Sequence, residues 1–340
     1  MEVRDDKRDV VVRGWLYIPP NDDAEQHNVT PIAGLIVLAP GSGGGLGPGV
    51  TEHPQPLANA PRASAYGAMY GRLGHELAHG VPCRNWNDCL AERNTKQLPP
   101  RRRAAAAGTR GGKAPRAAAN KRKPRHSRWA RCVTFQMDWT IIPRKRLRRQ
   151  PMLQSAVDDC LVAARFLQRR WPRAPLVLAG FSFGGPAVWP AALVLLREAS
   201  AASAADGDAA PLRRPLAGVC SIAGSGRGGD KYAAAGLHTR ACIQSVSGGA
   251  VASLFLQGSH DKNVALQVAE YLFEAARAPA CFARVNYSPH MMDCARAVAY
   301  PFFRDWVARQ DSAEHFCRLE APCCTAMGWL FIPAYCFAVP

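Results

Sequence analysis

The sequence predicts an α/β protein, in which a mostly parallel central sheet carries helices on both faces. Strand-like runs alternate with helix-like runs over most of the chain, which is the pattern of βα units. Several strand-like runs, such as residues 34–39, are continuously apolar, as expected for parallel strands buried on both faces. The length of 340 residues is sufficient for one large hydrophobic core.

The first elements are expected in the N-terminal quarter. Residues 10–18 are rich in Val, Trp and Tyr and end at two prolines, which is typical of a strand before a turn. The apolar run 34–39 predicts a central strand, and residues 64–78 have large apolar side chains at helical spacing. Residues 81–86 would open a further short strand.

The pattern breaks at residues 92–131, where Arg, Lys, Ala, Gly and Pro dominate and no core can form. The whole chain has 43 Lys and Arg against 26 Asp and Glu, a net charge of +17. Residues 92–150 hold 19 of the basic and only two of the acidic residues, so the remainder of the chain is balanced. The basic charge therefore describes one segment, and the folded part is not predicted to bind nucleic acid.

Regular alternation resumes at residue 132 with a strand-like run. A helix is expected from residue 155 to about residue 171, with Asp158 and Asp159 in its first turn. The remaining strands are expected at residues 175–179, 218–222, 253–257 and 283–287, and the remaining helices at residues 186–199, 264–276 and 295–309.

The domain organisation follows from these runs. Residues 1–91 and 132–311 are predicted to form the two parts of one core, and residues 92–131 a disordered basic insertion between them. Residues 312–340 form an apolar tail that contains cysteines. Gly328 and Pro333 argue against a continuous membrane-spanning helix there, so no membrane association is expected.

A nucleophile motif follows the strand predicted at residues 175–179. The motif is Gly180-Phe181-Ser182-Phe183-Gly184, a G-x-S-x-G pattern between a strand and a helix. This context is the one in which a serine is presented on a sharp turn. Ser182 is therefore the predicted nucleophile, and a tight turn without chemistry is the alternative.

A serine hydroxyl needs a base to take its proton and an acid to orient that base. Asp261 and His290 both follow predicted strands, at the carboxyl edge of the sheet where Ser182 also lies. The chain order Ser, acid, His favours His290 over His260 as the base. Asp261 could instead cap the following helix, His290 could be a surface residue, and Asp293 is a second candidate for the acid.

The negative charge that forms on a carbonyl oxygen during acyl transfer needs backbone N–H donors. One donor is expected from Phe183, directly after the nucleophile, and one from Gly41 or Ser42 in the glycine-rich loop after residues 34–39. That loop lacks the Lys-Ser/Thr of a P-loop and the spacing of a dinucleotide motif, so nucleotide binding is not expected. Cys317, Cys323 and Cys324 with His315 match no zinc spacing, so no metal is predicted, and no cofactor is predicted either.

Together, the loop at Gly41 and Ser42, the motif at Ser182, and Asp261 and His290 resemble the α/β-hydrolase superfamily. The similarity is to its dienelactone-hydrolase-like and testis-expressed-protein-thirty-like branches. The resemblance implies the α/β-hydrolase fold and an esterase, lipase or thioesterase. Dienelactone hydrolases use cysteine at the position of Ser182, and the His-Gly pair common in the oxyanion loop is Pro40-Gly41 here.

The predicted function is a serine hydrolase that acts on a small carboxylic ester or thioester through an acyl-enzyme. An inactive scaffold with the same fold is the alternative. The 12 cysteines, without an export signal, predict reduced thiols and a cytoplasmic protein. The basic runs leave nuclear localisation and contact with a polyanion open. The sequence does not predict the oligomeric state.

Overall fold

The computed structural model describes a core to which most of the predicted elements contribute. The described residues are 1–5, 10–19, 32, 34–42, 73–74, 77–78, 132–140, 152–205, 216–225, 238–248, 251–286, 288–290 and 317–321. All of them belong to one compact unit formed by residues 1–82 and 130–340. The predicted insertion at residues 92–131, the strand at residues 81–86 and the helix at residues 295–309 lie outside the described residues.

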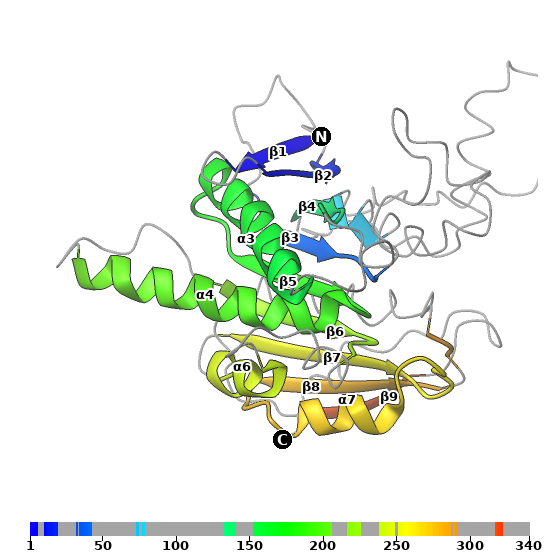
Figure 1. The fold of residues 1–340 in the computed structure, drawn as a ribbon. Helices are drawn as coiled ribbons and strands as arrows, with labels where there is room; N and C mark the ends of the chain where they lie inside the picture. Colours follow the sequence, from blue (N-terminus) through cyan, green and yellow to red (C-terminus); the bar gives the residue numbers. More distant parts are fainter. Residues whose placement is uncertain are drawn as a thin grey trace, which may run out of the picture. The chain divides into compact units, whose positions relative to one another are not determined.

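Nine described strands form one sheet in the order β1-β2-β4-β3-β5-β6-β7-β8-β9 (Figure 1). Neighbouring strands from β4 to β9 are parallel, whereas the pairs β1/β2 and β2/β4 are antiparallel, so the sheet is mixed. The strands are β1 Glu2–Asp5, β2 Val10–Tyr17, β3 Gly34–Ala39, β4 Cys132–Met137, β5 Leu176–Phe181, β6 Leu216–Ile222, β7 Ala252–Gly258, β8 Ala280–Val285 and β9 Cys317–Ala321.

Four described helices pack against one another in chain order and form one layer on a face of the sheet (Figure 1). They are α3 Met152–Arg170, α4 Gly184–Ala205, α6 Thr239–Val246 and α7 Leu266–Phe273. Leu35, Val37 and Phe135 point toward this layer and belong to one buried hydrophobic cluster with Val157 and Trp189 of the helices. Burial of this apolar surface is the main force that holds the helices on the sheet.

The alternate side chains of the strands are also buried, among them Ile36, Leu38 and Val177. They lie outside the cluster that faces the helix layer, as strand alternation requires. Burial on both faces explains why these strands are continuously apolar in the sequence. Of the helix predicted at residues 64–78, the structure describes residues 73–74 and 77–78, which are helical and include buried Leu73 and Leu77.

Three described elements were not predicted from the sequence. Strand β1 is short and charged, and it lies at the edge of the sheet; its one apolar residue, Val3, is buried. Helix α6 lies between β6 and β7, and β9 comes from the apolar tail and pairs with β8. One prediction was wrong: α3 begins at Met152, so Asp158 and Asp159 do not lie in its first turn.

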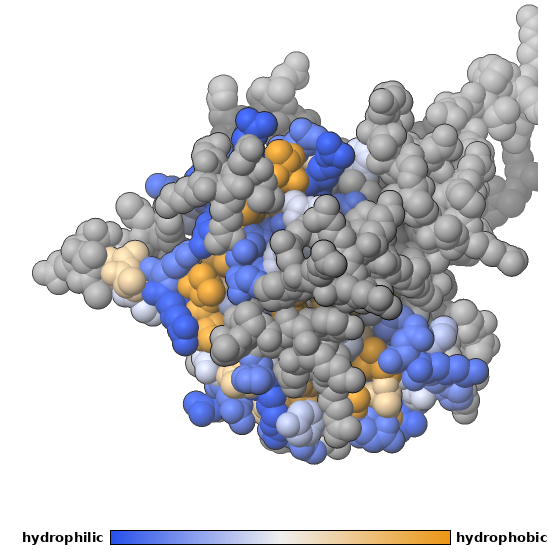
Figure 2. All heavy atoms as spheres, viewed as in Figure 1, coloured by the Kyte–Doolittle hydropathy of each residue, from blue (hydrophilic) through white to orange (hydrophobic). Residues whose placement is uncertain are grey.

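The visible surface of the described residues is mainly hydrophilic. Figure 2 shows hydrophobic residues in small separate groups on the face that it presents. No helix in the described parts of the chain is long and apolar enough to cross a membrane.

Candidate active site

Ser182 stands at a sharp turn between β5 and α4. Its backbone φ is 52°, a left-handed conformation that is rare for residues other than glycine. A Cβ atom on Gly180 would lie 2.2 Å from the Gly184 oxygen, and one on Gly184 would lie 2.5 Å from the Ala39 oxygen. Glycines at both positions are therefore required for the turn to close. The N–H of Ser182 donates to the Ile222 oxygen at 2.8 Å, which ties the strained residue to β6.

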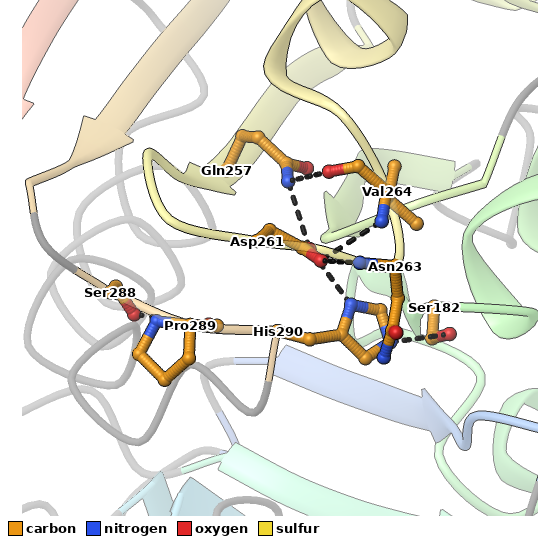
Figure 3. A network of polar contacts seen from close by, with 8 residues as sticks. All are labelled: Ser182, Gln257, Asp261, Asn263, Val264, Ser288, Pro289 and His290. Atoms are coloured by element: carbon orange, nitrogen blue, oxygen red, sulfur yellow. Dashed lines mark hydrogen bonds and ion pairs between the residues drawn. The ribbon is translucent and has the colours of Figure 1, made fainter.

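His290 lies in the loop after β8 and reaches the serine. Its Nε2 is 2.9 Å from Ser182 Oγ, across 108 residues of sequence (Figure 3). The imidazole is 10% exposed and lies against the Phe181 ring, with 5.2 Å between ring centroids. The hydroxyl and the base are thus at hydrogen-bonding distance, as proton transfer requires.

Asp261 lies in the loop after β7 and binds the other side of the imidazole. Its Oδ2 is 2.8 Å from His290 Nδ1. Its Oδ1 accepts the N–H groups of Asn263 and Val264 at 2.8 and 2.9 Å (Figure 3). One carboxylate therefore both contacts the histidine and holds the turn before α7, whose own N-cap residue is Ala265, so Asp261 does not cap the helix itself.

The pKa of Asp261 is below its ordinary value, although burial by itself would raise it. The hydrogen bonds from His290, Val264 and Asn263 and the charge of His290 outweigh burial because they stabilise the carboxylate. Asp261 is therefore ionised at neutral pH and can accept a hydrogen bond from the imidazole.

Gln257 is a site residue that the sequence analysis missed. It lies at the end of β7, and its Nε2 donates to Asp261 Oδ2 at 2.9 Å and to the Val264 oxygen at 2.9 Å. Its Oε1 is buried and has no hydrogen-bond partner in the described part of the structure. A polar side chain at the end of the otherwise apolar run Leu254-Phe255-Leu256 was the available signal.

The residues predicted to supply oxyanion donors lie beside the nucleophile. A Cβ atom on Gly41 would be 3.4 Å from the Ser182 Cβ, so this loop contacts the turn directly. The N–H groups of Gly41, Ser42 and Phe183 donate no hydrogen bond to another residue that the structure describes. These N–H groups are therefore available to an oxygen of a bound substrate.

The side chain of His260, the other candidate for the base, contacts a residue outside this network. His260 is exposed, and its Nδ1 lies 2.9 Å from the hydroxyl of Ser259. Asp293 lies outside the described residues. Among the residues that are described, no three His, Cys, Asp or Glu side chains are grouped as a metal site would need.

Five described cysteines are buried and lie outside the site, at positions 132, 160, 220, 242 and 281. Burial raises the pKa of Cys132 to about 12 and holds the pKa values of Cys160 and Cys220 well above that of an ordinary thiol. These thiols are packing groups and not nucleophiles.

Comparison with solved structures identifies the fold. The dienelactone hydrolase of Anabaena variabilis ATCC 29413 matches with a TM-score of 0.50 and 13% identity, over 90% of this chain and 94% of that chain. Est1E from Butyrivibrio proteoclasticus with ferulic acid bound matches with a TM-score of 0.51 and 9% identity, over 91% and 100%. No protein-family model and no curated protein sequence matches the chain.

These structures confirm the α/β-hydrolase fold that the sequence predicted, including its resemblance to dienelactone hydrolase. The similarity is one of backbone architecture, since the identities are 9% and 13%. The resemblance to the testis-expressed-protein-thirty-like branch stays a prediction.

Proposed function

We propose that this protein is a serine hydrolase that cleaves a small carboxylic ester or thioester through a Ser182-His290-Asp261 triad. The observation that supports the proposal is the unbroken hydrogen-bonded series from Ser182 Oγ through the His290 ring to Asp261 Oδ2, with distances of 2.9 and 2.8 Å. The similarity to esterase structures agrees with this activity at the level of the fold.

In the first half of the proposed reaction, His290 Nε2 takes the proton of Ser182 while Oγ attacks the carbonyl carbon of the substrate. Asp261 stabilises the resulting imidazolium and keeps its Nδ1 proton directed at Oδ2. The carbonyl oxygen becomes an oxyanion that the N–H groups of Phe183 and of Gly41 or Ser42 stabilise. His290 then gives its proton to the leaving alcohol or thiol, and an acyl-Ser182 remains.

In the second half, a water molecule replaces the leaving group. His290 takes a proton from the water, the oxygen of the water attacks the acyl carbon, and the proton returns to Ser182 Oγ as the acid leaves. The same base and the same oxyanion donors thus serve both halves. No cofactor is needed for either step.

The proposal is tested with a fluorophosphonate probe, which forms a Ser–O–P bond and releases fluoride. The wild type should be labelled, and Ser182→Ala should not. His290→Ala should lower kcat for a p-nitrophenyl ester by roughly 10⁴-fold or more, because the hydroxyl loses its base. His260→Ala is the matched control: it removes an exposed neighbouring imidazole and should leave kcat unchanged.

Two results would contradict the proposal. The first is equal labelling of the wild type and Ser182→Ala, which would place the reactive group elsewhere. The second is a folded wild type that neither reacts with the probe nor hydrolyses short or long acyl esters. That second result would favour the inactive scaffold.

A further inference from the structure

Trp139, two residues after β4, contacts both segments that carry the proposed oxyanion donors. Its indole Nε1 donates to the Gly41 oxygen at 2.9 Å in a buried hydrogen bond. Its ring meets the Phe183 ring edge to face, with 5.8 Å between centroids and an interplanar angle of 84°. Trp139 is 5% exposed, so the contacts are made inside the protein.

The hydrogen bond to Gly41 fixes the direction of a neighbouring N–H group. A trans peptide is planar, so the Gly41 C=O and the Ser42 N–H of the same peptide point in opposite directions. An acceptor oxygen held by Trp139 therefore turns the Ser42 N–H away from the indole. The hydrogen bond also restricts the backbone rotation that glycine would otherwise permit at position 41.

The segment that carries Trp139 is itself held in place. The N–H of Trp139 donates to Asp138 Oδ1 at 2.9 Å. The N–H and hydroxyl of Thr140 both donate to the buried carboxylate of Asp159 on α3, at 2.9 Å. Helix α3 thus fixes the backbone next to Trp139. The indole is therefore held in place where it donates to the Gly41 oxygen.

We propose that Trp139 is a positioning residue for the oxyanion hole. It orients the Gly41–Ser42 peptide through its Nε1–H and supports Phe183 through its ring. This inference rests on the proposed function. It predicts that the loss of the indole N–H weakens binding of the transition state and leaves binding of the ester ground state unchanged.

The test compares Trp139→Phe with Trp189→Phe. Trp139→Phe keeps an aromatic ring beside Phe183 and removes the donor. Trp189 is also a buried tryptophan, stacked on Phe255, but its Nε1 has no hydrogen-bond partner within the described residues, so it is the matched control. Trp139→Phe should lower kcat and the fluorophosphonate labelling rate by about 10- to 100-fold, with KM within about twofold.

A second variant separates this effect from a packing defect. Replacement of Trp139 by β-(3-benzothienyl)alanine keeps the size of the ring system but substitutes sulfur for N–H, and it should lower kcat as Trp139→Phe does. In the wild type, the indole N–H resonance of Trp139 should lie downfield of that of Trp189, because only the former is hydrogen bonded. This signal does not depend on activity.

Each outcome decides the inference. The inference is overturned if Trp139→Phe or the benzothienyl variant has the same kcat as Trp189→Phe. It is also overturned if either Trp139 variant raises KM and leaves kcat unchanged. An indole N–H resonance of Trp139 that lies upfield of that of Trp189 would show that the hydrogen bond to Gly41, on which the inference rests, is absent. In all three cases a labelled wild type leaves the proposed function standing, whereas a wild type without labelling ends both.

Discussion

Under the proposed function, Asp261 serves both folding and chemistry. Its Oδ1 receives two backbone N–H groups and its Oδ2 receives His290 and Gln257, so all four hydrogen bonds stabilise the ionised form. A carboxylate with these partners stays charged despite burial. The orientation of the base is thereby fixed by groups on β7 and the loop after it, before any substrate binds.

Gln257 is expected to affect the proposed base, His290, because both residues are hydrogen bonded to Asp261 Oδ2. In Gln257→Met, Asp261 Oδ2 loses one of its donors and becomes a stronger acceptor of the hydrogen bond from His290 Nδ1. The acid limb of the kcat/KM profile should shift to higher pH by about half a unit to one unit. The measurement is kcat/KM for an ester between pH 5 and 9.

The unpartnered Oε1 of Gln257 makes this substitution informative. No acceptor contact is lost with the amide, but its two buried hydrogen bonds to Asp261 Oδ2 and the Val264 oxygen are, so the free energy of unfolding should fall by about 1–3 kcal/mol while the pH profile moves. A reduced kcat at every pH with an unshifted limb would contradict the tuning role.

The meeting of Ser182, Asp261 and His290 at one edge of the sheet was predictable, whereas the contacts of the residues around them were not. Ser182, Asp261 and His290 each follow a strand in a recognisable order, and parallel strands bring such positions to one edge. Trp139 and Gln257 contact distant or buried partners; Trp139 and Gly41, for example, are 98 positions apart in the sequence. Their residue types alone are compatible with ordinary core packing.

At the level of elements, the end of β7 lies against the loop after β8, and the contact is made at Gly258. A Cβ atom on Gly258 would lie 2.3 Å from the Ser288 oxygen and 3.1 Å from the Pro289 oxygen. The N–H of His260 also donates to the Ser288 oxygen, at 3.1 Å. This close approach of two backbones brings His290 to Asp261.

Gly258→Ala should therefore damage catalysis more than stability. The added methyl group must displace residues 288–289, and His290 would move with them. We expect kcat/KM to fall by at least about tenfold and the free energy of unfolding by about 1–3 kcal/mol. Ester hydrolysis and urea unfolding of the same samples provide the measurements.

Gly14→Ala is the matched control for Gly258→Ala. Its Cβ would lie 2.5 Å from the Gln136 oxygen, a similar degree of crowding, but between β2 and β4. It should lower stability without a selective loss of kcat/KM. Equal activity losses in the two variants would show that crowding alone, and not the position of His290, explains the effect.

The long apolar strands β3, β5 and β7 were predictable because burial on both faces leaves an unmistakable composition. Strand β1 was not, because it is an edge strand with charged residues at three of its four positions. Helix α6 was also missed. Its eight residues are too few to show a clear helical period in the sequence.

For the molecule as a whole, stability should depend on pH through a buried acid away from the triad. Burial raises the pKa of Asp159 to about 6; hydrogen bonds from Thr140 lower it, and the charges of Asp158 and Asp138 raise it further. The folded state then binds this proton more tightly than the unfolded state. The stabilising contribution of the group is complete below about pH 4 and is lost as the pH rises through about 6.

Asp159→Asn should remove this dependence. The amide oxygen can still accept the N–H of Thr140, and no charge has to be buried. At pH 8 the variant should be more stable than the wild type by about 1–3 kcal/mol, and at pH 4 the difference should vanish or reverse. Urea unfolding at pH 4, 6 and 8 measures this difference.

Asp158→Asn provides the comparison for Asp159→Asn, because Asp158 is the neighbouring carboxylate on the same helix and is only half-buried. Its effect should be smaller and should not change sign between pH 4 and 8. A stability difference for Asp159→Asn that is constant with pH would mean that the carboxyl group does not titrate between folded and unfolded states.

The site is assembled from distant parts of the chain: Ser182 follows β5, Asp261 follows β7 and His290 follows β8, with 108 residues between serine and histidine. No local piece of the polypeptide contains all three groups, so a partly folded chain has no activated hydroxyl. Under the proposed chemistry, a fluorophosphonate would react only with molecules in which Ser182 is activated. The amount of label would therefore measure the fraction of native protein in a mixture. The reagent could then serve as an active-site titrant during purification and refolding.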